Sequence, residues 1–94
     1  MIYENLADEF LPLPLGRIVV DHSSKKRLSS EDIIPALGRH LFGDWGRIGR
    51  RQREANKKAL RTKRPLCSLY FSGDGVRFRV VTNAERSQTT VSVY

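Results

Sequence analysis

The last third of the chain alternates apolar and polar residues with the period of a β-strand, and two turns divide it. Gly73-Asp74-Gly75 is typical of a tight hairpin turn, and residues 83–87 form a second polar turn. We therefore expect strands over residues 66–72, 76–82 and 88–94, joined as an antiparallel meander. Such a sheet buries only one face, so the preceding residues have to supply the helices that cover it.

Alternation assigns the side chains of these strands to two faces. The face towards the helices is expected to hold Cys67, Leu69, Phe71, Val76, Phe78, Val80, Thr89, Val91 and Val93. The opposite face is expected to hold Ser68, Tyr70, Arg77, Arg79, Val81, Thr90, Ser92 and Tyr94. Its tyrosines and arginines are of the types that stack bases and clamp phosphates of single-stranded RNA. They are equally typical of an ordinary exposed sheet.

Two helices are expected before the meander. A β-branched strand over residues 17–21 and a polar loop over residues 22–28 precede the first helix, whose start has a capping-box pattern, Ser29-Ser30-Glu31-Asp32. Its apolar face, which must be buried, is formed by Ile33, Ile34, Leu37 and Leu41. The second helix is expected from about Arg50 to Thr62, with a thin apolar face of Ala55, Ala59 and Leu60.

A chain of 94 residues is long enough for a single domain. We expect an α+β fold: a short N-terminal strand, two helices, and a three-stranded antiparallel meander packed on them. Residues 1–16 form an acidic arm, residues 17–64 the strand and helices, and residues 65–94 the meander. Within the arm, residues 3–10 have helical spacing. Residues 11–15, Leu-Pro-Leu-Pro-Leu, are expected to be an extended strap that covers the core or docks a partner.

Positive charge is concentrated between residues 47 and 64. The segment has one acid, Glu54, and nine cations: Arg47, Arg50, Arg51, Arg53, Lys57, Lys58, Arg61, Lys63 and Arg64. Its net charge is therefore 9 − 1 = +8, whereas the whole chain carries +7. This pattern favours a polyanionic partner, above all DNA or RNA, with Arg77 and Arg79 on the sheet as further contacts. The alternative is a solvated helix face, which the acidic arm could also cover.

Several classes of function find no support in the sequence. No apolar run approaches the roughly 20 residues that span a bilayer, so no membrane partner is expected. The N-terminus lacks the features of a signal peptide, which favours the cytoplasm. Cys67 is the only cysteine, and no ligand spacing indicates a metal or a cofactor. His22 and His40 lie in no catalytic motif, so no catalytic residue is assigned.

Gly43-Asp44-Trp45-Gly46 joins the two expected helices. Asp44 can cap the following turn, Trp45 can anchor the turn in the core, and the glycines permit unusual backbone shapes. The element lacks the spaced glycines and lysine of a phosphate-binding loop. We expect a structural corner.

A wider pattern includes this corner: His40 to Gly46, Asn56, Ala59-Leu60, Ser68, Tyr70, Thr82, Arg86-Ser87, Thr89-Thr90 and Tyr94. It resembles a family of small bacterial proteins carried by plasmids, phages and other mobile elements, generically called plasmid-related proteins. The resemblance spans residues 37–94 and implies a mobile-element context without an established activity. Relatives usually have acids after the second glycine, where this chain has Arg47, Arg50 and Arg51, so the basic helix is particular to this chain.

The order of elements is also similar to that of ribosome-dependent RNA-cleaving toxins, which clamp RNA with basic residues and a late tyrosine. The matching residue types here are Arg77, Arg79, Arg86 and Tyr94. Three functions are therefore expected, in this order. The first is a non-enzymatic nucleic-acid-binding accessory protein of a mobile element, the second an RNA-cleaving toxin, and the third a protein-interaction module that binds a protein partner or forms a homodimer.

Overall fold

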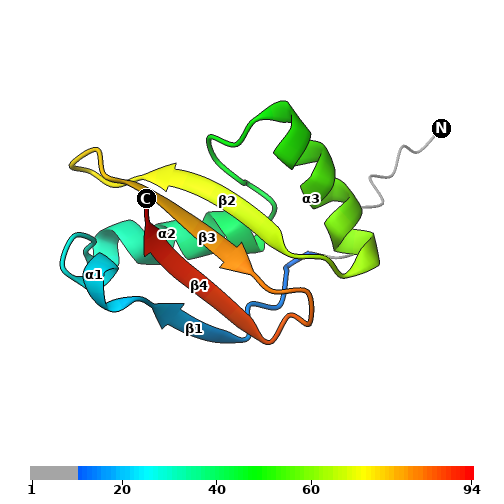
Figure 1. The fold of residues 1–94 in the computed structure, drawn as a ribbon, viewed down its shortest axis with the longest axis horizontal. Helices are drawn as coiled ribbons and strands as arrows, with labels where there is room; N and C mark the ends of the chain where they lie inside the picture. The colour runs from blue at the N-terminus through cyan, green and yellow to red at the C-terminus, as the bar shows by residue number, and fades with distance from the viewer. Residues whose placement is uncertain (1–10) are drawn as a thin grey trace.

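A four-stranded sheet lies at the centre of the computed structural model, which describes residues 11–94 (Figure 1). The strands are β1 (Arg17–Val20), β2 (Leu66–Phe71), β3 (Arg77–Thr82) and β4 (Gln88–Val93). Their order across the sheet is β1-β4-β3-β2, and the last three form the expected antiparallel meander. β1 pairs with β4 in parallel, so the sheet is mixed. The α+β class is confirmed.

The two expected helices are present as α2 (Ser30–Leu41) and α3 (Arg50–Thr62). The capping box at the start of α2 is also present, because the Ser29 N–H donates to the Asp32 carboxylate at 3.0 Å. The expected loop over residues 22–28 is wrong in part, since α1 (His22–Lys25) forms there. Asp21 caps this short helix by accepting the Ser24 N–H at 2.8 Å.

The helices cover only one face of the sheet. In Figure 1, α2 runs behind the sheet, α3 lies beside β2, and none of the three helices crosses the front. The contacts agree: α2 touches β2 and β3, α1 touches β4, and α3 touches β2. We call the covered side the inner face and the open side the outer face.

Two apolar clusters fill the interior. One lies under the middle of the sheet and consists of Leu28, Ala36, Tyr70, Phe78, Val80 and Val91. The other joins α3 to the start of β2 and consists of Leu13, Trp45, Ala59, Leu60 and Leu66. Leu11 and Leu15 pack against the second cluster, so the leucines of residues 11–15 form the expected strap over the core. The expected helix at residues 3–10 and the acidic part of the arm lie outside the described residues.

The expected orientation of β2 is wrong by one residue. Leu66, Ser68 and Tyr70 face inwards, because they pair in register with Thr82, Val80 and Phe78 of β3. Tyr70 is buried, whereas Phe71 is 50% exposed on the outer face with Cys67 and Leu69. A one-residue shift in a strand exchanges all of its inward and outward side chains.

The apolar face of α2 also differs from expectation. Ala36 and His40 are the buried residues of this helix, whereas Ile34 is 67% exposed. The other three residues of the expected apolar face, Ile33, Leu37 and Leu41, are half-buried. In α3, Ala59 and Leu60 are buried as expected, but Ala55 is exposed and Asn56 is buried in its place.

Candidate nucleic-acid interface

The cations of the basic segment all reach solvent. α3 buries Asn56, Ala59 and Leu60 against β2 and the strap, so its remaining sides face outwards. The nine cations between residues 47 and 64, six of them on α3 itself, are each exposed. The helix therefore presents positive charge on every side that does not touch the protein.

Few of the described carboxylates neutralise this charge. Within residues 11–94, the segment forms one ion pair, between Lys57 Nζ and Glu54 Oε1 at 3.7 Å. The other ion pair in the described part of the chain, Arg39 with Asp44, lies in the corner before α3. Ion pairing among these residues thus leaves most of the segment's charge facing water.

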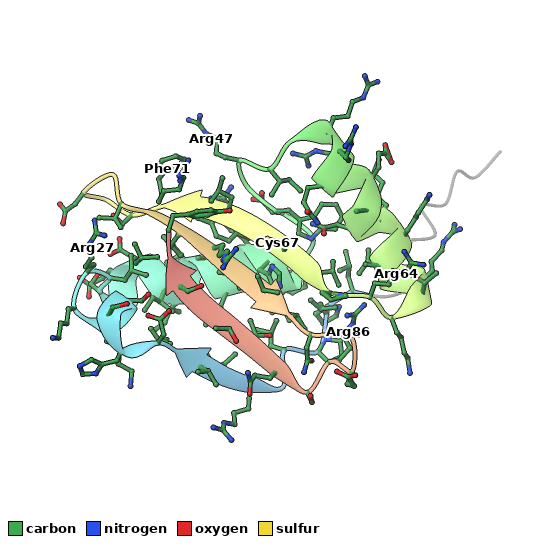
Figure 2. The ribbon with its side chains drawn as sticks, in the orientation of Figure 1. Arg27, Arg47, Arg64, Cys67, Phe71 and Arg86 are labelled. Carbon is green, nitrogen blue, oxygen red and sulfur yellow. The ribbon has the colours of Figure 1, made fainter. Side chains whose placement is uncertain are left out.

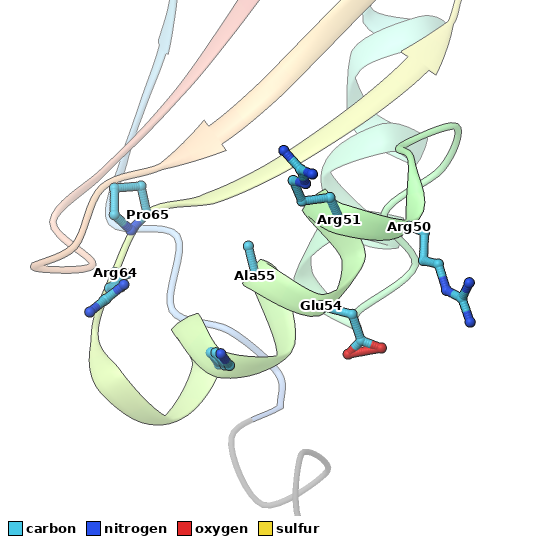
Figure 3. Close-up of a pocket in the computed structure, with 7 residues that line it drawn as sticks. Arg50, Arg51, Glu54, Ala55, Arg64 and Pro65 are labelled. Carbon is cyan, nitrogen blue, oxygen red and sulfur yellow. The ribbon is translucent and has the colours of Figure 1, made fainter.

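Part of the segment lines an open hollow of about 770 Å³ between α3 and the residues that lead into β2 (Figure 3). The lining residues are Arg50, Arg51, Glu54, Ala55 and Lys58 on the helix, and Arg64 and Pro65 on the other side. Figure 3 shows Arg51, Ala55 and Pro65 directed towards the space between the two elements. A negatively charged chain lying here would meet several cations at once.

The outer face brings aromatic rings and guanidinium groups together in pairs. Arg47 lies over the Phe71 ring, with its Cζ 5.6 Å from the ring centroid. Arg77 and Arg79 lie over the Tyr94 ring at 4.4 and 5.3 Å. Figure 2 shows Arg47 and Phe71 next to each other along β2. Three of the cations predicted to bind nucleic acid are thus held against exposed aromatic rings.

The outer face contains no carboxylate within the described strands. By register and alternation, its members are Arg17, Val19, Cys67, Leu69, Phe71, Arg77, Arg79, Val81, Gln88, Thr90, Ser92 and the adjacent Tyr94. Its formal charge is therefore purely positive. Burial raises the pKa of the Cys67 thiol, which keeps this side chain in its neutral form.

The corner formed by Gly43, Asp44, Trp45 and Gly46 is tied to the protein at each residue. Arg39 Nε and Nη2 donate to the Asp44 carboxylate at 2.8 and 3.1 Å, which holds the pKa of Asp44 below its ordinary value. The Tyr70 hydroxyl donates to the Asp44 carbonyl at 2.6 Å. Trp45 is buried in the cluster beside α3. Trp45 is therefore the buried anchor of the corner, whereas Asp44 is exposed and pairs with Arg39.

The same corner covers the free edge of β2 (residues 66–71). The Leu69 N–H donates to the Trp45 carbonyl at 3.1 Å, and the Arg47 N–H donates to the Leu69 carbonyl at 2.8 Å. Gly46 has a φ of +71°, and a Cβ there would lie 2.0 Å from the Leu69 oxygen, so only glycine fits. Further along, the Asn56 amide bonds both the N–H and the carbonyl of Cys67, at 3.2 and 2.9 Å.

His40 lies at the centre of a buried chain of hydrogen bonds. Thr89 Oγ1 donates to the Leu15 carbonyl at 2.7 Å, so Thr82 Oγ1 donates to Thr89 Oγ1. Nε2 of His40 must then donate to Thr82 at 2.9 Å, which leaves Nδ1 to accept from the Ser68 hydroxyl. The imidazole is therefore neutral with its proton on Nε2, and it is fully buried.

Two causes hold the pKa of His40 at about 4: burial, and the positive charge of Arg86. Arg86 itself closes the end of α3, with Nη2 donating to the Ala59 carbonyl at 2.6 Å and Nη1 to the Arg64 carbonyl at 2.7 Å. Its guanidinium group is therefore directed to the end of α3, whereas Arg77, Arg79 and Tyr94 lie together on the outer face. The four residue types of the toxin comparison do not gather at one place.

No family model matches the chain, and neither does a curated protein or a solved structure. The resemblance to plasmid-related proteins therefore stays a prediction. Among residues 11–94, no cluster of three or more His, Cys, Asp or Glu side chains is arranged to hold a metal ion. The described helices are also too short or too polar to cross a membrane.

Sequence reasoning missed two features of the candidate site. Phe71 was expected on the inner face, and the contact of Arg47 with a sheet residue was not expected, although Arg47 was among the predicted nucleic-acid contacts. The first follows from the β2 orientation. The second follows from the backbone pairing of residues 45–47 with Leu69, for which the only local signal is the glycine at position 46.

Proposed function

We propose that the protein binds nucleic acid by contacting phosphates through the basic segment, residues 47–64, and the adjacent outer face. The observation that carries the proposal is the exposure of all nine cations of that segment beside a single acid, Glu54. Phosphate contacts by lysine and arginine supply most of the affinity of such proteins, independently of sequence, because they release counterions.

The charge pattern of α3 works against the stability of the helix itself. Its first turn carries Arg50 and Arg51 and no acid, although acids are favoured at the positive end of a helix. Arg53, Lys57 and Arg61 follow one another at spacings of four residues, where like charges repel by roughly 0.2–0.5 kcal/mol per pair. A bound phosphate backbone would offset both the cations in the first turn and the repulsion between like charges. If the helix face only contacted water, nothing would compensate for these two destabilising effects.

The make-up of the outer face supports binding rather than bond cleavage. Its arginines and Tyr94 lie without a histidine or carboxylate among the described residues of that face. His40 is buried in its own hydrogen-bond chain, and His22 belongs to α1, which packs against β4 on the inner side of the sheet. General acid–base catalysis needs a group that exchanges protons near neutral pH within reach of the substrate. We therefore propose an accessory binding protein, in keeping with the mobile-element context that the sequence suggests.

The test compares two triple variants that remove equal charge. Arg53→Ala/Lys57→Ala/Arg61→Ala acts on α3, and Lys25→Ala/Lys26→Ala/Arg27→Ala acts on exposed cations near α1. Figure 2 places Arg27 at the opposite end of the molecule from Arg64. Alanine preserves the helix.

Binding is measured by fluorescence anisotropy with labelled single-stranded RNA, single-stranded DNA and duplex DNA at 50 and 200 mM salt. The α3 variant is expected to lose about two from the slope of log affinity against log salt for single strands. The α1 variant is expected to keep most of that slope. Equal losses in both variants, or no binding by the unaltered protein at low salt, would contradict the proposal.

A further inference from the structure

The outer face orders its aromatic and basic side chains in rows across the strands. Phe71 of β2 lies opposite Arg77 of β3, and the Tyr94 N–H bonds the Arg77 carbonyl at 3.1 Å. In the next row, Leu69 lies opposite Arg79, which lies opposite Ser92. Each arginine of β3 therefore lies between side chains of β2 and β4.

The two aromatic rings are exposed to an extent that the fold does not require. Phe71 is 50% exposed and Tyr94 is 58% exposed, although the inner face has buried rings at Tyr70 and Phe78. Each exposed ring has an arginine over it, and these guanidinium groups form no ion pair with a described carboxylate. Such a surface is complementary to a ligand that combines flat apolar groups with negative charge.

The spacing of the rings fits unpaired bases. Phe71 and Tyr94 are separated by β3, which corresponds to two strand spacings or about 10 Å. Bases within a duplex are stacked about 3.4 Å apart and cover one another, so a flat sheet cannot reach their faces. Bases of a single strand can splay and stack on aromatic side chains one at a time.

The sheet continues into the basic segment. Pro65 directly precedes β2, and by alternation it lies on the same side as Cys67, Leu69 and Phe71. Pro65 also lines the hollow beside Arg51 and Lys58 of α3. A strand of nucleic acid leaving the outer face along β2 would enter that hollow.

We infer that the outer face is a platform for single-stranded nucleic acid, on which Phe71 and Tyr94 stack bases and Arg47, Arg77 and Arg79 contact phosphates. The inference rests on the proposed function, because it names the form of nucleic acid that the same surface binds. The ligand lies across β2, β3 and β4 and continues along α3.

The test replaces the two rings and uses an exposed ring elsewhere as the control. Phe71→Ala and Tyr94→Ala remove the platform, whereas Phe42→Ala removes a side chain that is 63% exposed at the end of α2. Each platform variant is expected to weaken binding of labelled single-stranded RNA or DNA by about 5- to 100-fold. Duplex binding and the Phe42→Ala variant are expected to stay within about twofold. The variants Phe71→Trp and Tyr94→Phe are expected to retain single-strand binding, because each keeps an aromatic ring on which a base can stack.

The outcomes separate this inference from the proposed function. If single strands and duplex bind equally and the ring variants have no effect, the platform is wrong while phosphate binding by α3 stands. If nothing binds at 50 mM salt, both are wrong. If the ring variants instead turn a dimer into a monomer in analytical ultracentrifugation, the outer face is a homodimer interface and the platform is overturned. Comparison of the affinities for labelled single-stranded RNA and single-stranded DNA shows whether the site prefers ribose or deoxyribose.

Discussion

The inner and outer faces of the sheet are built from the same strands but use their polar groups in opposite ways. On the inner face, His40 is linked to the hydroxyls of Ser68 and Thr82 in a buried chain with no group left over. On the outer face, the guanidinium groups of Arg77 and Arg79 lie over the Tyr94 ring and form no ion pair with a described carboxylate. Polar groups that satisfy one another stabilise the fold, whereas groups that face solvent are available to a ligand.

The difference also separates the residues that carry the predicted resemblance: Thr90 and Tyr94 lie on the outer face, whereas most of the others are used inside the protein. Ser68, Tyr70, Thr82, Arg86 and Thr89 all make their hydrogen bonds inside the protein. They connect α2, α3 and the strap to the sheet. The proposed ligand contacts lie instead on the outer face and on α3, where the side chains are not used in this way.

The largest expected effect is the loss of the inner chain. His40→Ala should lower the free energy of unfolding by about 4 kcal/mol, because it leaves a cavity and two buried hydroxyls without their partner. Urea denaturation measures this, with His22→Ala, an exposed histidine, as the control. Thr82→Val should cost about 1–3 kcal/mol and keeps the test usable if the first variant does not fold. If His40→Ala and Thr82→Val each lowered the free energy of unfolding by less than about 0.5 kcal/mol, the inner hydrogen-bond chain would not be what stabilises the fold.

Acid should weaken the inner face next. His40 is neutral in the fold with a pKa of about 4, whereas an exposed histidine has a pKa of 6.5. Protonation therefore favours the unfolded chain. The contribution of neutral His40 to the free energy of unfolding is fully present above pH 6.5. It is lost as the pH drops from 6.5 to 4, by about 3 kcal/mol in total. Urea midpoints at pH 7.5, 6.5, 5.5 and 4.5 measure the fall.

His40→Gln should flatten the curve in this window and serves as its control. The carboxyls of Asp21, Asp32 and Asp44 also have pKa values held below their ordinary 3.8, so their contributions are lost at lower pH than that of His40. A fall of equal size in the His40→Gln variant would assign the acid sensitivity to other groups.

The smallest effect on stability is expected on the outer face. Arg77→Gln/Arg79→Gln should change the free energy of unfolding by less than about 1 kcal/mol, because exposed cation–π contacts contribute little. The same variant should reduce the salt slope of single-strand binding by about 1.4. Urea denaturation and anisotropy on one preparation measure both. A marked destabilisation with unchanged binding would assign these arginines to the fold.

The sequence was sufficient for the elements whose signals are local. The bounds of α3, the capping box of α2 and the turn at Gly73-Asp74-Gly75 follow from caps, glycines and charge pattern, and the structure has them. α1 was missed because four residues are too few for a periodic signal, and its cap, Asp21, was assigned to the preceding strand.

The orientation of β2 could not be read from its own residues. Leu66 and Tyr70 on one side, and Leu69 and Phe71 on the other, make both faces apolar, so alternation does not choose between them. What decides is the register with β3, where Phe78 and Val80 must be buried, and the need of His40 for a partner at Ser68. Both are contacts between distant parts of the chain. This single ambiguity displaced Phe71 from the candidate site and put Tyr70 in its place.

The closed edge of β2 limits how copies of this protein can join. Strand addition is the route by which sheets grow into fibrils, and it needs free N–H and carbonyl groups at an edge. At Cys67 and Leu69 those groups are already bonded to Asn56, Trp45 and Arg47. At the outer edge of β1, no described residue forms a closure of this kind. Two copies meeting there would leave no second edge for a third, so assembly by this route ends at a pair.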